Sequence, residues 1–398
     1  MDTISSLALQ GKDDEFYRRY PSRKRLVDSC LERVSWDALC RYASSKNSGR
    51  PCTLLGMSTI GGVYLIRLLS FGDMQWIARV QLEPSTPLSA SLLRAEIDTM
   101  ALVRAKTDIP IPHVFGYEFS DANEIGAAFI LMEFLPGPSA MDADGGYETH
   151  HGQIPTTKKE EFYREVAGIQ VQMASVRLPQ IGSITRRNDN SFEVGPIPGL
   201  EGPFPTATDY FREWAKQAKF PLPDEGIRSS MAGGPVEEII ESIKNFPRSL
   251  QNLANNIAGN NDDGPFPLYH PDFYHSNMIV DHKFRILGII DWEGASTVPW
   301  EIVEPPLFLS KVPLGMDDPN NYHADGTPKD RSVIQRLHES GEYVKFVQAK
   351  EEEMGLDRKL STTLLDSNIQ GLAYAIKVYR DPGKLGFYCK ILTPFNTS

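Results

Sequence analysis

The chain has 398 residues, a length that suits two or three subdomains better than one ordinary core. Hydrophobic residues make up 41% of the chain, so enough apolar surface is available to offset the entropy lost on folding, and disorder of the whole chain is not expected. The formal net charge of -11 at pH 7 argues against a nucleic-acid partner or an anionic membrane, because both require a basic surface.

The N-terminal sequence and the cysteines together favour a cytoplasmic location. The first residues, MDTISSLALQGKDDEFYRRYPSRK, have no basic start followed by a long apolar stretch, so we expect no secretory signal. No window approaches the roughly 18 uninterrupted apolar residues of a membrane helix, so we expect no membrane partner. The four cysteines are scattered without C-x-x-C spacing, which favours reduced, structural thiols over disulfides or a zinc site.

The part of the chain before Pro136 predicts a small sheet with one helix. Residues 52–83 contain short apolar runs broken by glycine, with SFGD as a turn signal, which is typical of an antiparallel meander. Residues 89–107 are expected to form a helix. One face of that helix carries Leu92, Glu96, Met100 and Val103. Extended segments in IPIPHVFGYEFS and AAFILMEFLPG complete the order β-β-β-α-β-β.

The remainder of the chain is expected to be mainly helical. One helix is predicted where apolar residues recur at steps of four and three, at Phe162, Val166, Ile169, Met173 and Val176. Residues 178–205 are rich in glycine and proline and predict a hairpin followed by a loop. Helical patterns return in DYFREWAKQA and VEEIIESIKNF. A last helical run is expected at Leu365, Ile369, Leu372, Ile376 and Tyr379.

These patterns predict an α+β fold with two lobes. Residues 1–45 would form an N-terminal helical extension, with a helix around SWDALCRYA. Residues 46–136 would form a small lobe built on an antiparallel β-sheet. Residues 137–398 would form a larger, mainly helical lobe.

The segment HPDFYHSNMIVDHKFRILGIIDWEGA, residues 270–295, places many polar side chains beside an apolar strand. Asp272 and Asn277 lie five residues apart in a loop, and a second carboxylate, Asp291, follows the strand. A loop of that length can aim a carboxylate and a carboxamide at one point, and oxygen ligands of this kind suit Mg²⁺. The remaining carboxylate can accept or orient a hydroxyl proton, which is the arrangement used for phosphoryl transfer.

The spacing H-x-D-x-x-x-x-N, followed by Ile289, Ile290, Asp291 and Trp292, resembles the aminoglycoside phosphotransferase and choline kinase family, and in particular its large fungal branch. The resemblance covers residues from roughly 50 to 310 and implies a two-lobed protein-kinase-like fold. The smaller lobe would bind the nucleotide. The larger lobe would hold the catalytic loop, the metal site and the acceptor pocket. By this resemblance Asp272 is the catalytic base, Asn277 and Asp291 hold Mg²⁺, and His270 braces the loop.

The resemblance also implies nucleotide-binding residues in the smaller lobe. Gly56, Gly61 and Gly62 would cover the nucleotide, although they do not form the G-x-G-x-x-G pattern. Arg79 stands where the family usually has lysine, and it would contact the phosphates while paired with Glu96 of the following helix. Backbone groups for adenine would come from the hinge residues Glu133 and Leu135.

Other interpretations of single residues remain open. His270, Asp272 and His275 could instead hold the metal of a hydrolase, because histidine is the commonest metal-binding side chain. Arg79 could be a surface charge on its strand. Glu293 could be a further carboxylate for a metal or substrate, or could make a structural hydrogen bond. The acidic residues 351–353 are expected on a solvated helix face.

The resemblance as a whole implies an ATP-dependent, Mg²⁺-requiring O-phosphotransferase that acts on a hydroxyl group of a small-molecule acceptor. One alternative, motivated by Arg79 and the irregular glycine segment, is a pseudokinase-like module that binds a nucleotide or a partner without turnover. Another is a kinase fold recruited to non-phosphoryl chemistry in specialised metabolism. Mg²⁺-dependent ATP turnover separates the first of these alternatives from the enzyme. The sequence does not identify the acceptor or any protein partner.

Overall fold

The computed structural model describes residues 12–231 and 233–396, which divide into two compact units. The N-terminal unit comprises the described residues up to Arg104 together with Ile109–Lys158 and His275–Glu293. The C-terminal unit comprises Ala105–Asp108, Lys159–Tyr274 and the described residues from Gly294 onwards. This division differs from the predicted lobes, since residues 137–158 and 275–293 belong to the N-terminal unit.

A five-stranded antiparallel sheet forms the centre of the N-terminal unit, with the strand order β1-β2-β3-β5-β4. Its strands are β1 (Thr53–Ile60), β2 (Tyr64–Ser70), β3 (Gln75–Gln81), β4 (Val114–Glu118) and β5 (Phe129–Glu133). Helix α5 (Pro87–Lys106) lies between β3 and β4 along the chain. The predicted order β-β-β-α-β-β is therefore confirmed.

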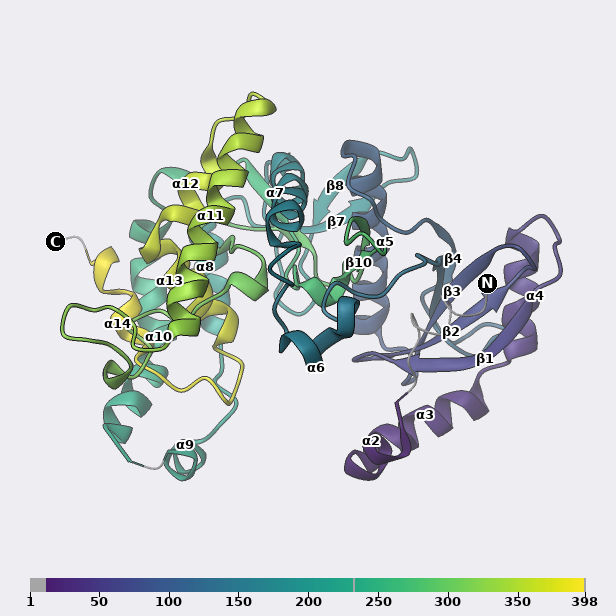
Figure 1. Cartoon of the computed structure of the whole chain (residues 1–398), viewed down its shortest axis with the longest axis horizontal. Helices are drawn as coiled ribbons and strands as arrows, with labels where there is room; N and C mark the ends of the chain where they lie inside the picture. Colours follow the sequence, from purple (N-terminus) through teal and green to yellow (C-terminus); the bar gives the residue numbers. More distant parts are fainter. Residues whose placement is uncertain (1–11, 232, 397–398) are drawn as a thin grey trace. The chain divides into compact units, whose positions relative to one another are not determined.

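The two faces of this sheet pack against different helices. Phe129 and Leu131 belong to a core with α3 (Pro21–Arg33) and α4 (Trp36–Lys46), whereas Ile130 and Met132 belong to a core with α5. The split follows from the strand geometry, because successive side chains point to opposite faces. Figure 1 shows α4 beside the sheet and confirms the helix expected around SWDALCRYA.

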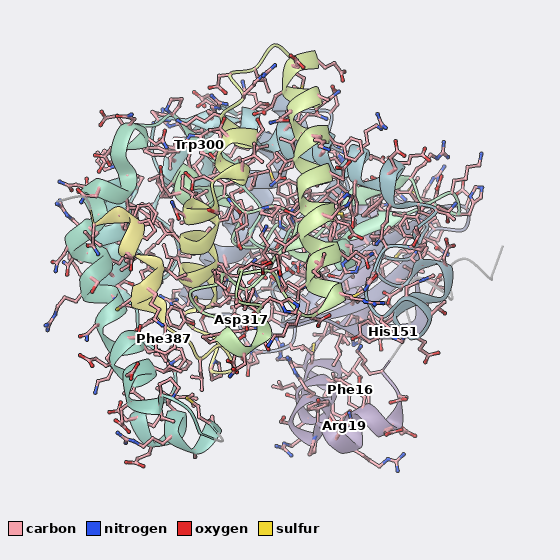
Figure 2. All side chains as sticks on the ribbon, turned by 60° about the vertical axis from the view of Figure 1, so that its left-hand side comes forward. Phe16, Arg19, His151, Trp300, Asp317 and Phe387 are labelled. Atoms are coloured by element: carbon pink, nitrogen blue, oxygen red, sulfur yellow. The ribbon has the colours of Figure 1, made fainter. Side chains whose placement is uncertain are left out.

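Two short helices complete this unit. Helix α2 (Asp14–Arg19) precedes α3, and α6 (Gly146–His150) follows the sheet along the chain. Figure 2 shows Phe16 and Arg19 on α2. The ring of Phe16 lies 5.0 Å from that of Tyr20, which joins the end of α2 to the start of α3 by an aromatic contact.

A two-stranded ribbon carries the segment that contains Asn277 and Asp291. Strand β10 (Met278–Val280) pairs antiparallel with β11 (Ile286–Ile289). A hydrogen bond of 2.8 Å from the Ile289 N–H to the Pro110 carbonyl ties the ribbon to the rest of the N-terminal unit. The predicted strand before Asp291 is confirmed, but it ends two residues before that carboxylate.

The C-terminal unit combines helices with a second small sheet of order β6-β9-β12-β7-β8. Its strands are β6 (Arg177–Leu178), β7 (Gly182–Arg186), β8 (Phe192–Gly195), β9 (Phe266–Tyr269) and β12 (Ser296–Thr297). Its helices are α7 (Lys159–Ser175), α8 (Ala207–Gln217), α9 (Asp224–Ser230), α10 (Val236–Ala258), α11 (Arg331–Glu353), α12 (Lys359–Leu365), α13 (Ser367–Val378) and α14 (Tyr388–Ile391). The predicted hairpin within 178–205 is confirmed by β7 and β8.

Aromatic side chains fill the core of the C-terminal unit. Phe246 of α10 lies 5.4 Å from the ring of Tyr379 and 5.3 Å from the ring of Tyr388, and all three are buried. Helix α8, which Figure 1 draws close to α10, contributes Phe211 and Trp214 to the same core. Aromatic residues bury large areas, so this cluster contributes strongly to the stability of the unit.

The C-terminal apolar run was predicted to form one helix, but it is divided between two helices. Helix α12 ends at Leu365, whose side chain is 58% exposed, and α13 begins at Ser367. The carboxylate of Asp366 accepts hydrogen bonds from the N–H groups of Asn368 and Ile369. An aspartate in this role starts a new helix, because it satisfies donors that have no partner inside the helix. The spacing of apolar residues continues across Asp366, so this spacing alone does not show that one helix ends and another begins there.

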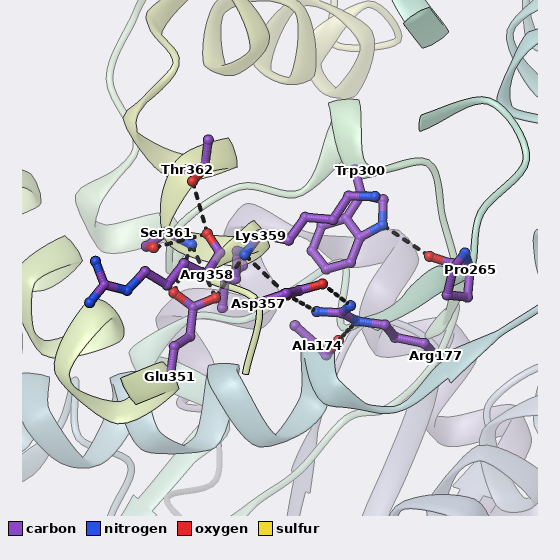
Figure 3. A network of polar contacts seen from close by, with 11 residues as sticks. Ala174, Arg177, Pro265, Trp300, Glu351, Asp357, Arg358, Lys359, Ser361 and Thr362 are labelled. Atoms are coloured by element: carbon purple, nitrogen blue, oxygen red, sulfur yellow. Dashed lines mark hydrogen bonds and ion pairs between the residues drawn. The ribbon is translucent and has the colours of Figure 1, made fainter. Parts of the chain in front are cut away.

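A buried acidic residue joins α11 to α12 (Figure 3). Glu351 is 1% exposed, and its carboxylate accepts hydrogen bonds from the backbone N–H of Leu360 at 3.0 Å and from that of Ser361 at 3.3 Å. These donors lie in the first turn of α12 and have no partner inside the helix. The expectation of a solvated face is therefore wrong for Glu351, whereas Glu352 and Glu353 are exposed.

Candidate functional site

A cavity of about 470 Å³ lies within the N-terminal unit. The turn between β1 and β2, strand β3, the chain after β5 and the ribbon segment all contribute to its walls. The expected site residues among its lining are Gly61, Gly62, Arg79, Glu133, Leu135, Asn277 and Asp291. Three other expected residues, Gly56, Glu96 and Asp272, do not line it.

The turn between β1 and β2 places the backbone of two glycines, together with Val63, at the cavity. The Gly61 N–H donates to the Tyr64 carbonyl at 3.0 Å, and a Cβ at Gly61 or Gly62 would meet no atom within 4 Å. Arg23 of α3 donates to the Gly62 carbonyl, so a neighbouring helix holds the turn. Because Gly61 and Gly62 have no side chains, a ligand can approach their backbone closely. Gly56 lies within β1, away from this turn.

Arg79 is the central cation of the cavity. Its Nη1 lies 2.6 Å from Glu96 Oε1, its Nη2 lies 3.3 Å from Asp291 Oδ1, and its guanidinium carbon lies 4.3 Å from the centre of the Tyr64 ring. The Arg79 side chain is only 10% exposed. The alternative of a surface strand charge is therefore wrong. Arginine suits this position because its planar fork can reach two carboxylates while it stacks on an aromatic face.

Burial and mutual charge set the protonation behaviour of this group. Burial favours a lower pKa for Arg79, but the carboxylates of Glu96 and Asp291 raise that pKa overall, so the guanidinium stays charged. Burial raises the pKa of Glu96, although Arg79 opposes the change. Glu96 Oε2 is buried and has no hydrogen-bond partner among the described residues. Its position as a helical partner of Arg79 matches the sequence-based expectation.

Glu293 adds a further carboxylate to the cavity. Burial raises its pKa, and the negative charges of Glu96 and Asp291 raise it further. Within residues 12–231 and 233–396 its carboxylate has no hydrogen-bond partner, so the structural hydrogen bond considered from the sequence is not made there. With Arg79 as the only paired cation of the group, the three carboxylates carry an excess of negative charge when ionised. Such a group attracts cations.

Asn277 and Asp291 lie at the same end of the ribbon, since Asn277 directly precedes β10 and Asp291 follows the end of the antiparallel strand β11. The Asn277 carbonyl accepts a hydrogen bond of 3.0 Å from the Ile290 N–H, which fixes the chain beside Asp291. Asp291 has a positive φ of 64°, a conformation uncommon for residues other than glycine. Its side chain is 43% exposed, in contrast to the buried Glu96. Strained backbone of this kind often occurs where a side chain must be aimed at a ligand.

The apolar walls of the cavity were not identified from the sequence. They include Ile66, Ile77, Met132, Ile279 and Ile290. A signal for some of them was available, because Ile77 is two residues from Arg79 and strand residues at i and i+2 share a face. Leu135 adds a backbone N–H that has no acceptor among the described residues. This combination of flat apolar surface and open backbone donor suits a planar heterocycle.

Asp272 belongs to the C-terminal unit and is exposed. Its backbone N–H donates to His270 Nδ1 at 3.2 Å, and its carbonyl accepts from the Tyr274 N–H at 2.8 Å. His270 is fully buried, so the imidazole holds the loop from inside, in agreement with the bracing role expected for it.

His275 has a structural role. It is fully buried, and its Nε2 lies 2.9 Å from the Gly152 carbonyl within the N-terminal unit. Burial lowers the pKa of this imidazole, so the neutral form is favoured. In the described part of the chain no group of three or more His, Cys, Asp or Glu residues is arranged to hold a metal. The buried contact of His275 with the Gly152 carbonyl is thus a structural one and differs from the metal contact that the hydrolase alternative requires.

The chain is similar to fungal proteins. It is 22% identical over 348 residues to altered inheritance of mitochondria protein 9 of Saccharomyces cerevisiae, a match that covers 73% of this chain and 54% of that protein. It is 26% identical over 117 residues to a subtelomeric hrmA-associated cluster protein of Aspergillus fumigatus, covering 27% of this chain and 22% of that protein. The chain therefore spans about half of the length of the yeast relative.

The expected cytoplasmic location is wrong in the light of these relatives. The yeast proteins that match the chain are named as mitochondrial. The expectation rested on composition and cysteine spacing, and neither of these encodes a cellular address. Among the residues that the structure describes, none of the helices has both the length and the apolar character needed to cross a membrane.

A solved structure supports the fold assignment. A Ralstonia eutropha protein assigned as an aminoglycoside phosphotransferase superposes with a TM-score of 0.52 at 14% identity, and the match covers 87% of each chain. At this identity the likeness concerns the fold alone. The expected α+β, kinase-like fold is thereby confirmed.

The sequence also matches a family as a whole. The model of the phosphotransferase enzyme family aligns with residues 63–300, which is more than half of the chain. The matched segment runs from the start of β2 to Trp300 and includes Arg79, Asp272 and Asp291. The resemblance drawn from the sequence motifs is confirmed, and the chain belongs to the phosphotransferase enzyme family.

Proposed function

We propose that this protein is an ATP-dependent, Mg²⁺-requiring phosphotransferase that acts on a hydroxyl group of a small molecule. The observation that carries the proposal is the convergence of Arg79, Asn277 and Asp291 on one cavity beneath the Gly61–Gly62 turn. Phosphoryl transfer requires this set of parts, namely a flexible cover, a cation for phosphates and oxygen ligands for a metal. Each part comes from a different element of the N-terminal unit.

The cavity fits ATP as a substrate. Its volume of about 470 Å³ lies within the usual range of roughly 300–1,000 Å³ for small-molecule sites. The base would lie between the apolar walls, with the Leu135 N–H as a hydrogen-bond donor. The phosphates would lie near the Gly61–Gly62 turn and Arg79, where backbone donors and a positive charge are available.

The residues present also fit Mg²⁺. The orphaned buried oxygen of Glu96 and the raised pKa of Glu293 both indicate more negative charge than Arg79 alone balances. Asn277 and Asp291 would hold the ion, and Mg²⁺ typically takes few protein ligands together with substrate phosphates. When bound, the metal would neutralise charge on the phosphates during transfer.

We assign to Asp272 the handling of the acceptor proton. The acceptor hydroxyl oxygen would form a bond to the γ-phosphorus, the bond from that phosphorus to the bridging oxygen would break, and ADP would leave. The hydroxyl proton would pass to the Asp272 carboxylate. The exposure of this carboxylate and the rigid support from His270 suit that role.

The test is ATP turnover with Mg²⁺ in the presence of a panel of hydroxylated small molecules, measured as ADP and phosphorylated product. We expect Asp272→Asn to lower turnover by roughly 10²–10⁴-fold without changing ATP affinity. Asp263→Asn, an exposed carboxylate in the same unit, serves as the matched control and should leave turnover unchanged. Unchanged turnover in a folded Asp272→Asn protein would contradict the assignment.

A nucleotide-binding module without turnover is the second candidate. The Arg79–Asp291 ion pair of 3.3 Å favours it, because this contact engages the carboxylate that would otherwise hold the metal. Such a module would bind ATP and form no ADP with any acceptor. Phosphorylated product formed by the wild-type protein and lost in Asp272→Asn would exclude this candidate.

A further inference from the structure

A second cavity, of about 310 Å³, lies entirely within the C-terminal unit. Its walls come from the loop after β8, helix α8, the end of β9 and the chain that follows it, the chain at Ile302 and Glu304, and the end of α13 with the residues that follow it. The volume corresponds to about ten water molecules in the liquid, enough for a small organic molecule of one ring with substituents. The proposed function does not use this cavity, and it contains none of the residues predicted from the motifs.

Aromatic side chains form one wall of this cavity. Tyr210 and Trp214 are four residues apart on α8 and therefore share a face, and Tyr269 ends strand β9. All three are largely buried, with exposed fractions of 7%, 7% and 9%. Rigid aromatic rings at a partly open cavity offer flat surface to a ring or chain of a ligand.

One acidic residue of the cavity is already neutralised by a protein partner. The Glu304 side chain is 4% exposed, and its Oε2 lies 3.1 Å from Lys377 Nζ. Burial raises the pKa of Glu304, and Lys377 opposes that change. Because the pair is internally balanced, Glu304 does not provide a free negative charge for a cationic ligand.

Arg380 is a cation of the cavity without a protein counterion. It lies three residues after Lys377 and is exposed. No carboxylate among residues 12–231 and 233–396 lies within ion-pair distance of it. Arg380 and Tyr210 both line the cavity, and the charge of Arg380 opposes the burial that raises the pKa of Tyr210 to about 12. The net charge of the residues that line the cavity is therefore positive.

The cavity adjoins the loop that carries Asp272. Pro271 lines the cavity and precedes Asp272 directly in the chain. The Asp272 charge also contributes to the raised pKa of Tyr269, after burial and the charges of Glu304 and Tyr210. A ligand in this cavity would thus lie near the carboxylate assigned to the acceptor proton.

We propose that this cavity binds the acceptor, and that the acceptor is a small hydroxy acid whose carboxylate pairs with Arg380 while its apolar body packs on Tyr210 and Trp214. The part of the proposal that requires a hydroxyl group on the ligand rests on the proposed phosphotransferase function. The binding preference for an anionic ligand rests on the cavity alone. Arginine and a carboxylate can form a charge-assisted, two-pronged hydrogen bond, which gives both affinity and orientation.

The test compares three molecules with one carbon frame, 4-(hydroxymethyl)benzoate, its methyl ester and 4-(hydroxymethyl)benzylamine. Binding to the full chain is measured by saturation-transfer NMR and calorimetry without ATP, and phosphoryl transfer is measured separately with ATP and Mg²⁺. We expect the acid to bind roughly tenfold more tightly than the ester, and the amine to bind most weakly. We expect Arg380→Gln to abolish the preference for the acid, and Arg331→Gln, an exposed arginine of the same unit, to preserve it.

The two readouts separate the two proposals. Binding of the acid that depends on Arg380, without any phosphoryl transfer, would leave the cavity assignment intact and count against the phosphotransferase function. Equal or tighter binding of the amine, an unchanged preference in Arg380→Gln, or no binding of any of the three molecules would overturn the cavity assignment.

Discussion

At the scale of single residues, Arg79 determines the character of the nucleotide cavity. A lysine at this position would present one compact ammonium, whereas the guanidinium of Arg79 contacts Glu96 and Asp291 through different nitrogens. Arg79 is also packed on Tyr64, a contact that a lysine would make over a smaller area. The contacts around Arg79 therefore accommodate an arginine at the position where the family usually has lysine.

We expect Arg79→Ala to weaken binding of MgATP by roughly 10–100-fold and Arg79→Lys to weaken it by less, because lysine keeps the positive charge. Arg79→Ala should also destabilise the fold by about 3–5 kcal/mol, since it leaves Glu96 buried without its partner. Calorimetry measures the nucleotide affinity, and urea unfolding measures the stability. Equal affinity in the two variants would show that Arg79 does not contact the phosphates.

Glu301 gives the protein a pH-dependent stability. Burial raises the pKa of this residue from 4.5 to about 7, although a hydrogen bond from Asn261 opposes the rise. The folded state therefore retains a proton that the unfolded state has lost between about pH 4.5 and pH 7. The contribution to stability is present below the lower pH and is lost as the pH rises through about 7.

We expect Glu301→Gln to match the wild type in stability near pH 4.5 and to exceed it at pH 8 by an amount on the order of 3 kcal/mol. Urea unfolding of both proteins at several pH values between 4.5 and 8 measures the difference. The exposed Glu353→Gln is the control and should follow the wild type. If the stabilities of the wild type and Glu301→Gln changed with pH in parallel, the raised pKa of the buried Glu301 carboxyl would be contradicted.

At the scale of elements, the end of one helix depends on the side chain of another. Glu351 of α11 supplies the acceptor for the first turn of α12, as Figure 3 shows. Nearby, Arg177 pairs with Asp357 and stacks on Trp300, so the segment before α12 is also fixed from outside. The short helix α12 therefore depends on tertiary contacts, as expected for an element of only a few residues.

We expect Glu351→Ala to lower the free energy of unfolding by about 1–3 kcal/mol, because buried backbone donors lose their acceptor. Glu353→Ala, two residues away and exposed, should change it by less than about 0.5 kcal/mol. Urea unfolding monitored by far-UV circular dichroism gives both values. Equal effects of the two substitutions would show that Glu351 does not cap α12.

The same elements show what could be predicted from the sequence and what could not. The meander was predicted because glycine-containing turns separate its short apolar runs, and α5 and α7 were predicted because apolar residues recur in them at helical spacing. The break at Asp366 was missed because a capping aspartate interrupts a helix without changing the apolar spacing. Glu351 was misjudged because its acceptor role depends on a helix that begins eight residues later.

At the scale of the whole molecule, the candidate site was predictable where local spacing carries the chemistry. Asn277 and Asp291 follow from a loop and a strand that are close in sequence, and the structure places both at one cavity. Ile66, Met132 and Ile279 were not identified, because apolar wall residues look like ordinary core positions until distant segments come together. The Arg380 cavity was missed for the same reason, since its residues come from five separate stretches of the chain.

In the proposed site, Asp291 and Asn277 would hold the metal that accompanies a nucleotide bound by Arg79. The most direct test is calorimetry of ATP binding with and without Mg²⁺, on the wild type, Asp291→Asn and the control Asp73→Asn, whose exposed carboxylate lies elsewhere in the N-terminal unit. We expect Mg²⁺ to strengthen ATP binding to the wild type and to the control.

In Asp291→Asn we expect the opposite dependence of ATP affinity on Mg²⁺. With Mg²⁺ the affinity should fall by at least about tenfold, because a metal ligand is lost. Without Mg²⁺ it should equal or exceed that of the wild type, because a negative charge near the phosphates is removed and Arg79 loses a competing partner. The proposed metal site would be contradicted if Mg²⁺ changed the ATP affinity of Asp291→Asn and of the wild type equally. It would also be contradicted if the wild type bound no ATP under either condition.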